Sequence, residues 1–369
     1  MPVFVSSAAA ALMSAPLLQA LLFAGAACLT ALSLWLMLHS NWGAVFADVP
    51  NQRSLHVAPV PRIGGMAIAA TVIIGLMALA WLPLGLAGAR SLLRDVFLCA
   101  IPLFIVSAID DRHNLSAGQR ILVHLAAAIL LMLVLLWHVR FLWIQQSQSG
   151  AWMLTAIGAL GMVLAVVWST NLFNFMDGAD GLAGGMAAIG FGAYSITAIN
   201  APGGAWLAAS CAVISGAAAG FLAFNFPPAR IFLGDAGAVP LGFLAAALGI
   251  FGNMAGIWPW WFGVLVFSPF IADATVTLCK RVVRREKFWQ AHRQHYYQQL
   301  ILRGWSHRRT ALTYYFLMLA SAVSALLAQK AGLRGVILLS WVITYALLAL
   351  LLEWRFQNNN KDKNHTGST

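Results

Sequence analysis

The chain has 369 residues, of which 61% are hydrophobic and only 9% are charged, and its formal net charge is +11. A soluble domain carries about 25% charged residues, so the composition excludes an ordinary soluble protein. A transmembrane β-barrel is not expected, because its strands would alternate apolar and polar residues. Nucleic-acid binding is not expected either, because the basic residues lie in connections between apolar runs.

Most apolar residues fall in runs of roughly 20, the length at which a helix crosses a bilayer. We count about eleven such runs, of which those around Phe104 and Ala245 are short. They centre near Ser33, Val72, Phe104, Ala128, Ala159, Ile189, Val213, Ala245, Leu265, Met318 and Ile343. The first run lacks a preceding basic segment, so we expect a retained span. The predicted fold is all-α, a polytopic helical membrane protein. We expect one integral-membrane domain over residues 1–355, with a large connection at 280–310 and a polar tail at 356–369.

Lys and Arg are distributed unequally between alternate connections. Segments 41–62, 110–120, 225–236 and 280–310, together with the tail, hold 17 of them, and the intervening connections hold 5. Because cytoplasmic connections carry the excess of Lys and Arg, the side with 17 is predicted to be cytoplasmic. This orientation places the N-terminus outside and the C-terminus inside.

Five of the eleven acidic residues lie at ends of apolar runs, where solubility does not explain them: Asp110, Asp111, Asp177, Asp180 and Asp235. Ionised carboxylates at a membrane edge are costly unless they are hydrated, paired or bound to metal. A shared divalent cation would remove their mutual repulsion, and oxygen ligands suit Mg²⁺ or Mn²⁺. The alternative is that these acids cap helices or pair with loop arginines.

Two stretches combine these acids with glycine. In FNFMDGADGL, residues 173–182, polar residues recur every three positions from Asn171 onward, which places neighbours on about one helix face. Its glycines would let the backbone approach a ligand. In FNFPPARIFLGDAG, residues 224–237, prolines end a helix and Phe232 precedes Asp235 by three residues. Phe232 could stack on a base or anchor at the membrane interface. We include Asn225 among the nucleotide-binding candidates.

Two further connections hold candidates for anion binding. The stretch NQRSLHVAPVPRIGG, residues 51–65, is a proline-containing loop with Arg53 and Arg62, and arginine suits phosphate because its planar fork donates two hydrogen bonds. The stretch RREKFWQAHRQHYYQQL, residues 284–300, holds Arg293 between His292 and His295. The alternatives are positive-inside charge for the first and an amphipathic surface helix for the second.

In order along the chain, RSLHVAPVPRIGG, AIDDRHNLSAGQR, NLFNFMDGADGLAGG, ARIFLGDAGAVPLG and HRQHYYQ resemble the motifs of the polyprenyl-phosphate N-acetylhexosamine-1-phosphate transferases. The resemblance implies transfer of a sugar 1-phosphate from a UDP-N-acetylhexosamine to undecaprenyl phosphate, which releases UMP and starts a lipid-linked glycan. It also implies a Mg²⁺ or Mn²⁺ requirement. The implied location is the bacterial inner membrane with a cytoplasmic active site. A homodimer is left open.

By the same resemblance, Asp235 is expected to be the principal metal ligand, with Asn174 or Asp177 beside it. Asp110 and Asp111 match the paired acids of the family, which orient or deprotonate the lipid phosphate; with Asp177 they are the catalytic candidates.

The nucleotide and its phosphates have their own candidates. Phe232 is expected to stack on uracil and Asp180 to contact its edge. The phosphate-binding candidates are Arg53, Arg62, Arg120, Arg293 and His295.

The histidine motif departs from that of many relatives, because tyrosines follow His295 where clustered histidines are common. This departure favours the branch that initiates O-antigen over a MurNAc-pentapeptide substrate. The main rival function is a transporter or flippase of lipid-linked or nucleotide sugars, whose site would lie near the bilayer midplane. Asp273, which lies inside a predicted span, is the candidate acid for such a transport site. Alternatively, it could pair with a nearby arginine.

Overall fold

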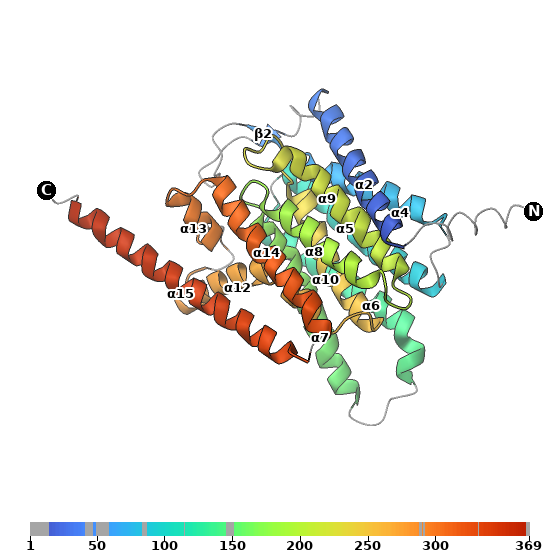
Figure 1. Ribbon diagram of the computed structural model, residues 1–369. Helices are drawn as coiled ribbons and strands as arrows, with labels where there is room; N and C mark the ends of the chain where they lie inside the picture. Colours follow the sequence, from blue (N-terminus) through green and yellow to red (C-terminus); the bar gives the residue numbers. More distant parts are fainter. Residues whose placement is uncertain are drawn as a thin grey trace, which may run out of the picture.

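The structure is a computed structural model that describes residues 15–40, 47–48, 59–82, 87–113, 115–144, 151–287, 290, 292–330 and 332–366. The described part is almost entirely helical (Figure 1). Its helices are α2 (Ala15–Leu38), α4 (Gly64–Leu79), α5 (Ala87–His113), α6 (Ala117–Ile144), α7 (Ala151–Met176), α8 (Leu182–Ala198), α9 (Ala205–Asn225), α10 (Asp235–Met254), α11 (Trp261–Val266), α12 (Ser268–Val283), α13 (Tyr296–Leu302), α14 (His307–Lys330) and α15 (Arg334–Thr366). Two short strands, β1 (Ala47–Asp48) and β2 (Val60–Pro61), pair antiparallel.

The predicted all-α membrane fold is confirmed, and the chain is a multi-pass membrane protein. Within the described residues, 8 helices are long and apolar enough to cross a bilayer, and α4 and α8 are shorter apolar helices. The count of eleven is not established. The runs around Phe104 and Ala245, predicted to be short, form helices of 27 and 20 residues. The run around Leu265 is divided into α11 and α12, where Phe267 departs from helical geometry just before Pro269.

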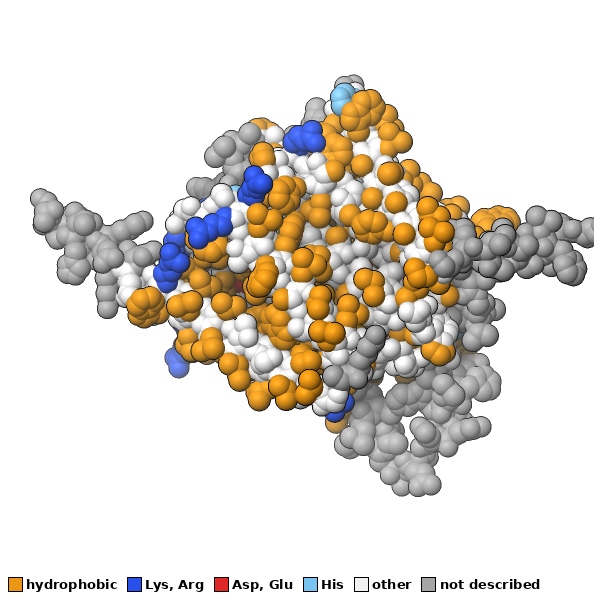
Figure 2. All heavy atoms as spheres, viewed as in Figure 1, with side chains coloured by type: hydrophobic (Ala, Val, Ile, Leu, Met, Phe, Trp, Pro, Cys, Tyr) orange, Lys and Arg blue, Asp and Glu red, His pale blue; other side chains and the backbone are white. Residues whose placement is uncertain are grey.

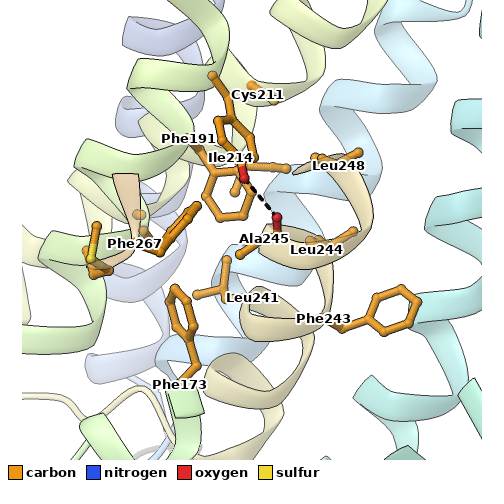
Figure 3. Packing of buried hydrophobic residues seen from close by; sticks show 14 of the residues in the cluster. Phe173, Phe191, Cys211, Ile214, Leu241, Phe243, Leu244, Ala245, Leu248 and Phe267 are labelled. Atoms are coloured by element: carbon orange, nitrogen blue, oxygen red, sulfur yellow. Dashed lines mark hydrogen bonds between the residues drawn. The ribbon is translucent and has the colours of Figure 1, made fainter. Parts of the chain in front are cut away.

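The centre of the bundle is apolar and aromatic. Phe173 of α7, Phe191 of α8 and Phe267 at the break between α11 and α12 lie together there and are each buried (Figure 3). The Phe173 and Phe267 ring centroids are 5.8 Å apart, and those of Phe191 and Phe267 are 6.0 Å apart in an edge-on arrangement. The Tyr194 hydroxyl donates to the Ala245 carbonyl at 3.1 Å, which satisfies a polar atom that would be costly to bury alone.

Small residues set the contact between α2 and α9. Gly216 and Gly220 are four residues apart on α9, and a Cβ added to either would lie 2.2 Å from a carbonyl oxygen of α2, at Phe23 and Ala27 respectively. This spacing is the small-xxx-small pattern that lets membrane helices approach closely.

The 280–310 connection and the C-terminal segment contain more helix than the sequence indicated. α12 extends to Val283, the seven-residue helix α13 follows, and α14 begins at His307. The last helix, α15, extends to Thr366 and so includes most of the segment expected to be a tail. It runs outward from the body toward the C-terminus (Figure 1).

Basic side chains gather near one end of the bundle. In Figure 2 they lie along the margin near α13 and the start of α14, whereas hydrophobic side chains cover most of the remaining face. β2, α13 and the first residues of α14 lie toward the same end in Figure 1. The segments that carry the predicted site residues meet at this polar end.

We expect Gly220→Ala to loosen the α2–α9 contact, because its Cβ would collide with backbone rather than with a movable side chain. Overpacking of this kind costs about 1–3 kcal/mol. The measurement is the thermal unfolding midpoint in detergent, with Gly25→Ala as the matched control because a Cβ at Gly25 has no neighbour within 4 Å. Equal midpoints for the two variants would contradict the packing argument.

Candidate active site

Two arginines and three acids, from α5, α6, α10 and the connection before α4, form an ion-pair network at this end. Arg120, in the first turn of α6, contacts Asp110 through Nε at 3.1 Å and Asp235 through Nη1 at 3.3 Å. Arg62 lies 3.6 Å from Asp111. Asp110 also accepts a hydrogen bond from the Leu115 backbone N–H at 2.6 Å. The C-terminal end of α5 and the N-terminal ends of α6 and α10 are therefore joined by charge.

Asp111 caps α10 from a distant part of the chain. Its two carboxylate oxygens accept the Asp235 and Ala236 backbone N–H groups at 3.0 Å each. A helix N-terminus has unpaired N–H groups and a favourable field for an anion. The residue before the helix, Gly234, has φ +73°, and a Cβ there would lie 2.8 Å from Asp111. Glycine is therefore required both for the backbone angle and for the carboxylate's approach.

Backbone hydrogen bonds join two of the sequence motifs. The Phe232 N–H donates to the Pro61 carbonyl at 2.8 Å, and the Gly64 N–H donates to the Phe232 carbonyl at 3.0 Å. A Cβ at Gly65 would lie 2.2 Å from the backbone nitrogen of Gly237, so the RIGG segment packs directly on the first turn of α10. This contact is what delivers Arg62 to Asp111.

The turn between α7 and α8 brings a fourth carboxylate to the network. Asp177 lies near Gly234 and Asp235, and Asn174 lies beside Asp235. The pKa of Asp177 is raised well above its ordinary value, first by burial and then by repulsion from Asp235 and Asp111. Repulsion within a buried acidic group is the effect that a bound cation removes.

Asp180 and Asn225 are adjacent in space and already have partners within the protein. Asp180 accepts the Ala229 N–H at 3.0 Å, and its other oxygen lies 3.1 Å from Nδ1 of His307. Asn225 is buried; its side chain accepts the Gly181 N–H and donates to the Ile231 carbonyl, both at 2.8 Å. The contacts of Asn225 are those of a residue that holds two loops together, and its nucleotide contact stays a prediction.

The histidine motif is anchored by Asp273. The Asp273 carboxylate accepts the backbone N–H groups of Tyr296 and Tyr297 at 2.8 and 3.1 Å, together with the Tyr314 hydroxyl. It lies 3.6 Å from Nδ1 of the buried His295. Of the two possibilities left open for Asp273, the pairing with a nearby arginine gives way to contacts with His295, Tyr314 and the backbone of α13. Because its carboxylate is taken up by α13 and α14, Asp273 has the contacts of a structural residue and not of a midplane transport site.

Burial lowers the pKa of His292 to about 4, with a further contribution from His295 and Arg281. At neutral pH His292 is therefore an uncharged ring beside His295, with ring centroids 4.9 Å apart. The fixed positive charge of this loop comes from its arginines.

The structure brings most of the predicted site residues together, although their roles stay predictions. The network contains Arg62, Asp110, Asp111, Arg120, Asn174, Asp177 and Asp235. Phe232 joins it through the backbone, whereas Arg293 lies half-buried in the turn before α13. Arg53 lies outside the described residues. Among the residues that the structure describes, no three His, Cys, Asp or Glu side chains are placed to hold a metal ion by themselves.

Two histidines of this region were missed by the sequence analysis. His307 contacts Asp180, and the buried His124 lies near Asn171, Arg120 and Asp110. His307 precedes Arg308 and Arg309, and this basic cluster was interpreted only as positive-inside charge. His124 follows Arg120 by four residues, so its position on the same helix face was an available signal.

The chain is similar to known proteins over the segments that carry these site residues. Residues 93–253 match the model of glycosyl transferase family 4. The chain is 28% identical over 317 residues to the probable undecaprenyl-phosphate N-acetylglucosaminyl 1-phosphate transferase of Bacillus subtilis, covering 84% of this chain and 82% of the relative. It is 30% identical over 303 residues to the decaprenyl-phosphate N-acetylglucosaminephosphotransferase of Mycobacterium tuberculosis, covering 76% and 74%. It is 36% identical over 160 residues to the phospho-N-acetylmuramoyl-pentapeptide-transferase of Geobacillus kaustophilus, covering only 43% and 48% of the two chains.

We expect Asp111→Ala to destabilise the polar end of the bundle, because two N–H groups of α10 and the Arg62 side chain lose their acceptor. Each unsatisfied buried donor costs about 1–3 kcal/mol. Asp111→Asn retains one acceptor oxygen and should lose less. Thermal unfolding of both variants tests the order, and an unchanged midpoint for Asp111→Ala would rule out the capping role.

Proposed function

The chain belongs to the polyprenyl-phosphate N-acetylhexosamine-1-phosphate transferases, and on this premise we propose that it transfers an N-acetylhexosamine 1-phosphate from a UDP-sugar to undecaprenyl phosphate. The observation that carries the proposal is the meeting of Asp110, Asp111, Asp177 and Asp235 with Arg62 and Arg120 at one end of a helical bundle. Transfer of a phosphorylated sugar depends mainly on positioning and charge neutralisation, which this group of residues can supply.

N-acetylglucosamine is the first candidate sugar. The Bacillus subtilis and Mycobacterium tuberculosis relatives, which align over 84% and 76% of the chain, are both named for it, whereas the MurNAc-pentapeptide enzyme aligns over less than half. The start of O-antigen synthesis is the proposed purpose, based on the tyrosines after His295. The donor's uracil would lie between Phe232 and Asp180, which belong to the two glycine-containing stretches.

The donor set fits a divalent cation. The network holds four carboxylates and two guanidinium groups, which leaves an excess of two negative charges when all are ionised. Mg²⁺ commonly takes only one or two protein carboxylates and completes its shell with water and substrate phosphate, so a site without three converging acids is compatible with it. Asp177, Asp235 and Asn174 would hold the ion, and Mn²⁺ suits the same oxygens. When bound, the metal supplies positive charge to offset the donor's diphosphate.

The residues of the chain position the reactants. An oxygen of the lipid phosphate attacks the β-phosphorus of the UDP-sugar, and the bond from that phosphorus to the bridging oxygen breaks to release UMP. A phosphate monoester has a second pKa of about 6, so the attacking group is mostly dianionic at neutral pH and needs no strong base. Asp110 is held by Arg120 and the Leu115 N–H, an arrangement that favours an orienting role.

The site is proposed to face the cytoplasm of a bacterial inner membrane. The supporting observation is that the network shares its end of the bundle with the connection at 280–310, which holds nine of the 17 basic residues on that side. UDP-sugars are cytoplasmic substrates in this proposal, and the apolar helix surfaces would admit the polyprenyl chain from the bilayer.

The purified protein should release UMP from UDP-N-acetylglucosamine in the presence of undecaprenyl phosphate and Mg²⁺. Chelation with EDTA should abolish the release, and added Mg²⁺ or Mn²⁺ should restore it. A panel of UDP-amino sugars identifies the preferred donor. Absence of UMP release from every donor in the panel would refute the proposed reaction and favour transport.

The pH dependence of turnover by the Asp110→Asn variant distinguishes two roles for Asp110: orienting the lipid phosphate and accepting a proton from it. We expect the pH profile of turnover to keep its shape while its amplitude falls about 100-fold, because misplaced reactants lose rate on that scale. Loss of one ionisation limb from the profile would instead identify Asp110 as a base. Arg308→Ala is the control, because Arg308 is an exposed residue on α14 outside the network.

A further inference from the structure

His307, the first residue of α14, contacts the acid predicted to bind the base of the donor. Its Nδ1 lies 3.1 Å from Oδ1 of Asp180 and 3.3 Å from the Asp180 backbone nitrogen. A proton on Nδ1 allows donation to the carboxylate, and its absence would allow acceptance from the N–H. In the structure the Asp180 N–H donates to Nδ1, and the 3.1 Å contact of the same ring nitrogen with Oδ1 places His307 against both polar groups of Asp180.

The rest of the Asp180 environment leaves this carboxylate little freedom. Its second oxygen accepts the Ala229 N–H at 3.0 Å. On the following residue, the Gly181 N–H donates to Asn225 and the Gly181 carbonyl accepts the Tyr315 hydroxyl at 2.7 Å. A Cβ at Gly185 would lie 2.0 Å from the Tyr315 ring, so α14 packs tightly against the start of α8. α14 therefore holds both the side chain and the backbone of this turn.

We propose that His307 is a positioning residue that orients the Asp180 carboxylate and thereby sets the preference of the donor site for uracil over cytosine. The inference rests on the proposed function. Uracil presents an N3–H donor to a carboxylate. Cytosine presents an acceptor at N3, and two acceptors cannot form a hydrogen bond with each other. A carboxylate with a fixed orientation discriminates between the two, because the wrong base leaves buried polar groups unpaired. A carboxylate that can turn away loses this discrimination.

Calorimetric binding of UMP and CMP tests the proposal without turnover. For His307→Ala we expect UMP binding to weaken about 10-fold, the upper range for loss of one ordinary hydrogen bond, and the ratio of the CMP to the UMP dissociation constant to fall with it. In turnover, the KM for UDP-N-acetylglucosamine should rise while kcat changes little, because Asp180 is not at the reacting phosphorus. Arg308→Ala, at the next position and exposed, should leave the binding ratio unchanged.

Conservative variants distinguish positioning from a general effect on folding. The side-chain amide of Asn places a polar atom near the position of Nδ1, with its oxygen able to accept the Asp180 N–H, whereas the amide of Gln reaches the place of Nε2. His307→Asn should therefore retain the CMP-to-UMP ratio and His307→Gln should lose it, and this pair carries the test if His307→Ala does not fold. An unchanged ratio in both Ala and Gln variants overturns the inference. Failure of the proposed function is a separate result, because it appears as absence of UMP release from the unmodified protein.

Discussion

The polar end of this bundle depends on the balance between buried or half-buried carboxylates and the groups that compensate them. Four acids meet there, and two arginines and the first turn of α10 offset part of their charge. Charges held in a low-dielectric region interact strongly and cannot be left unpaired. The pKa of Asp177 is raised in response. A bound cation would neutralise the excess negative charge of the acids, and a diphosphate substrate would pair with the cation and the arginines. The repulsion that destabilises the free protein therefore favours binding.

Helix ends and glycine contacts make this gathering of charge sterically feasible. Gly65 and Gly234 stand where a Cβ would meet the backbone of α10 or the Asp111 carboxylate. The close approach lets backbone N–H groups, as well as side chains, serve as partners for the acids. Such partners are fixed by the helix and need little reorganisation on binding.

Two acids of the chain stabilise the packing of helices through their contacts. Asp111 caps α10 and Asp273 caps α13, each from another helix. α14 adds His307 and Tyr315 to the turn that carries Asp180. Because these contacts cross between helices, the ion-pair network and the predicted base-binding turn are connected through the same packed helices. The fold thus couples the predicted phosphate and nucleotide regions through the α7–α8 turn and α10.

The amino-acid sequence alone determined the membrane class, the helical fold and the segments that carry the acids, because hydropathy, proline and glycine act over neighbouring residues. It could not determine that Arg120 reaches Asp235, 115 residues away, or that Asp273 faces α13 rather than an arginine. It also missed the break at Phe267 and the contact of His307 with Asp180. Those pairings were decided by the tertiary structure. They follow from which helices pack together, and that packing depends on side-chain shape across the bundle rather than on spacing along the chain.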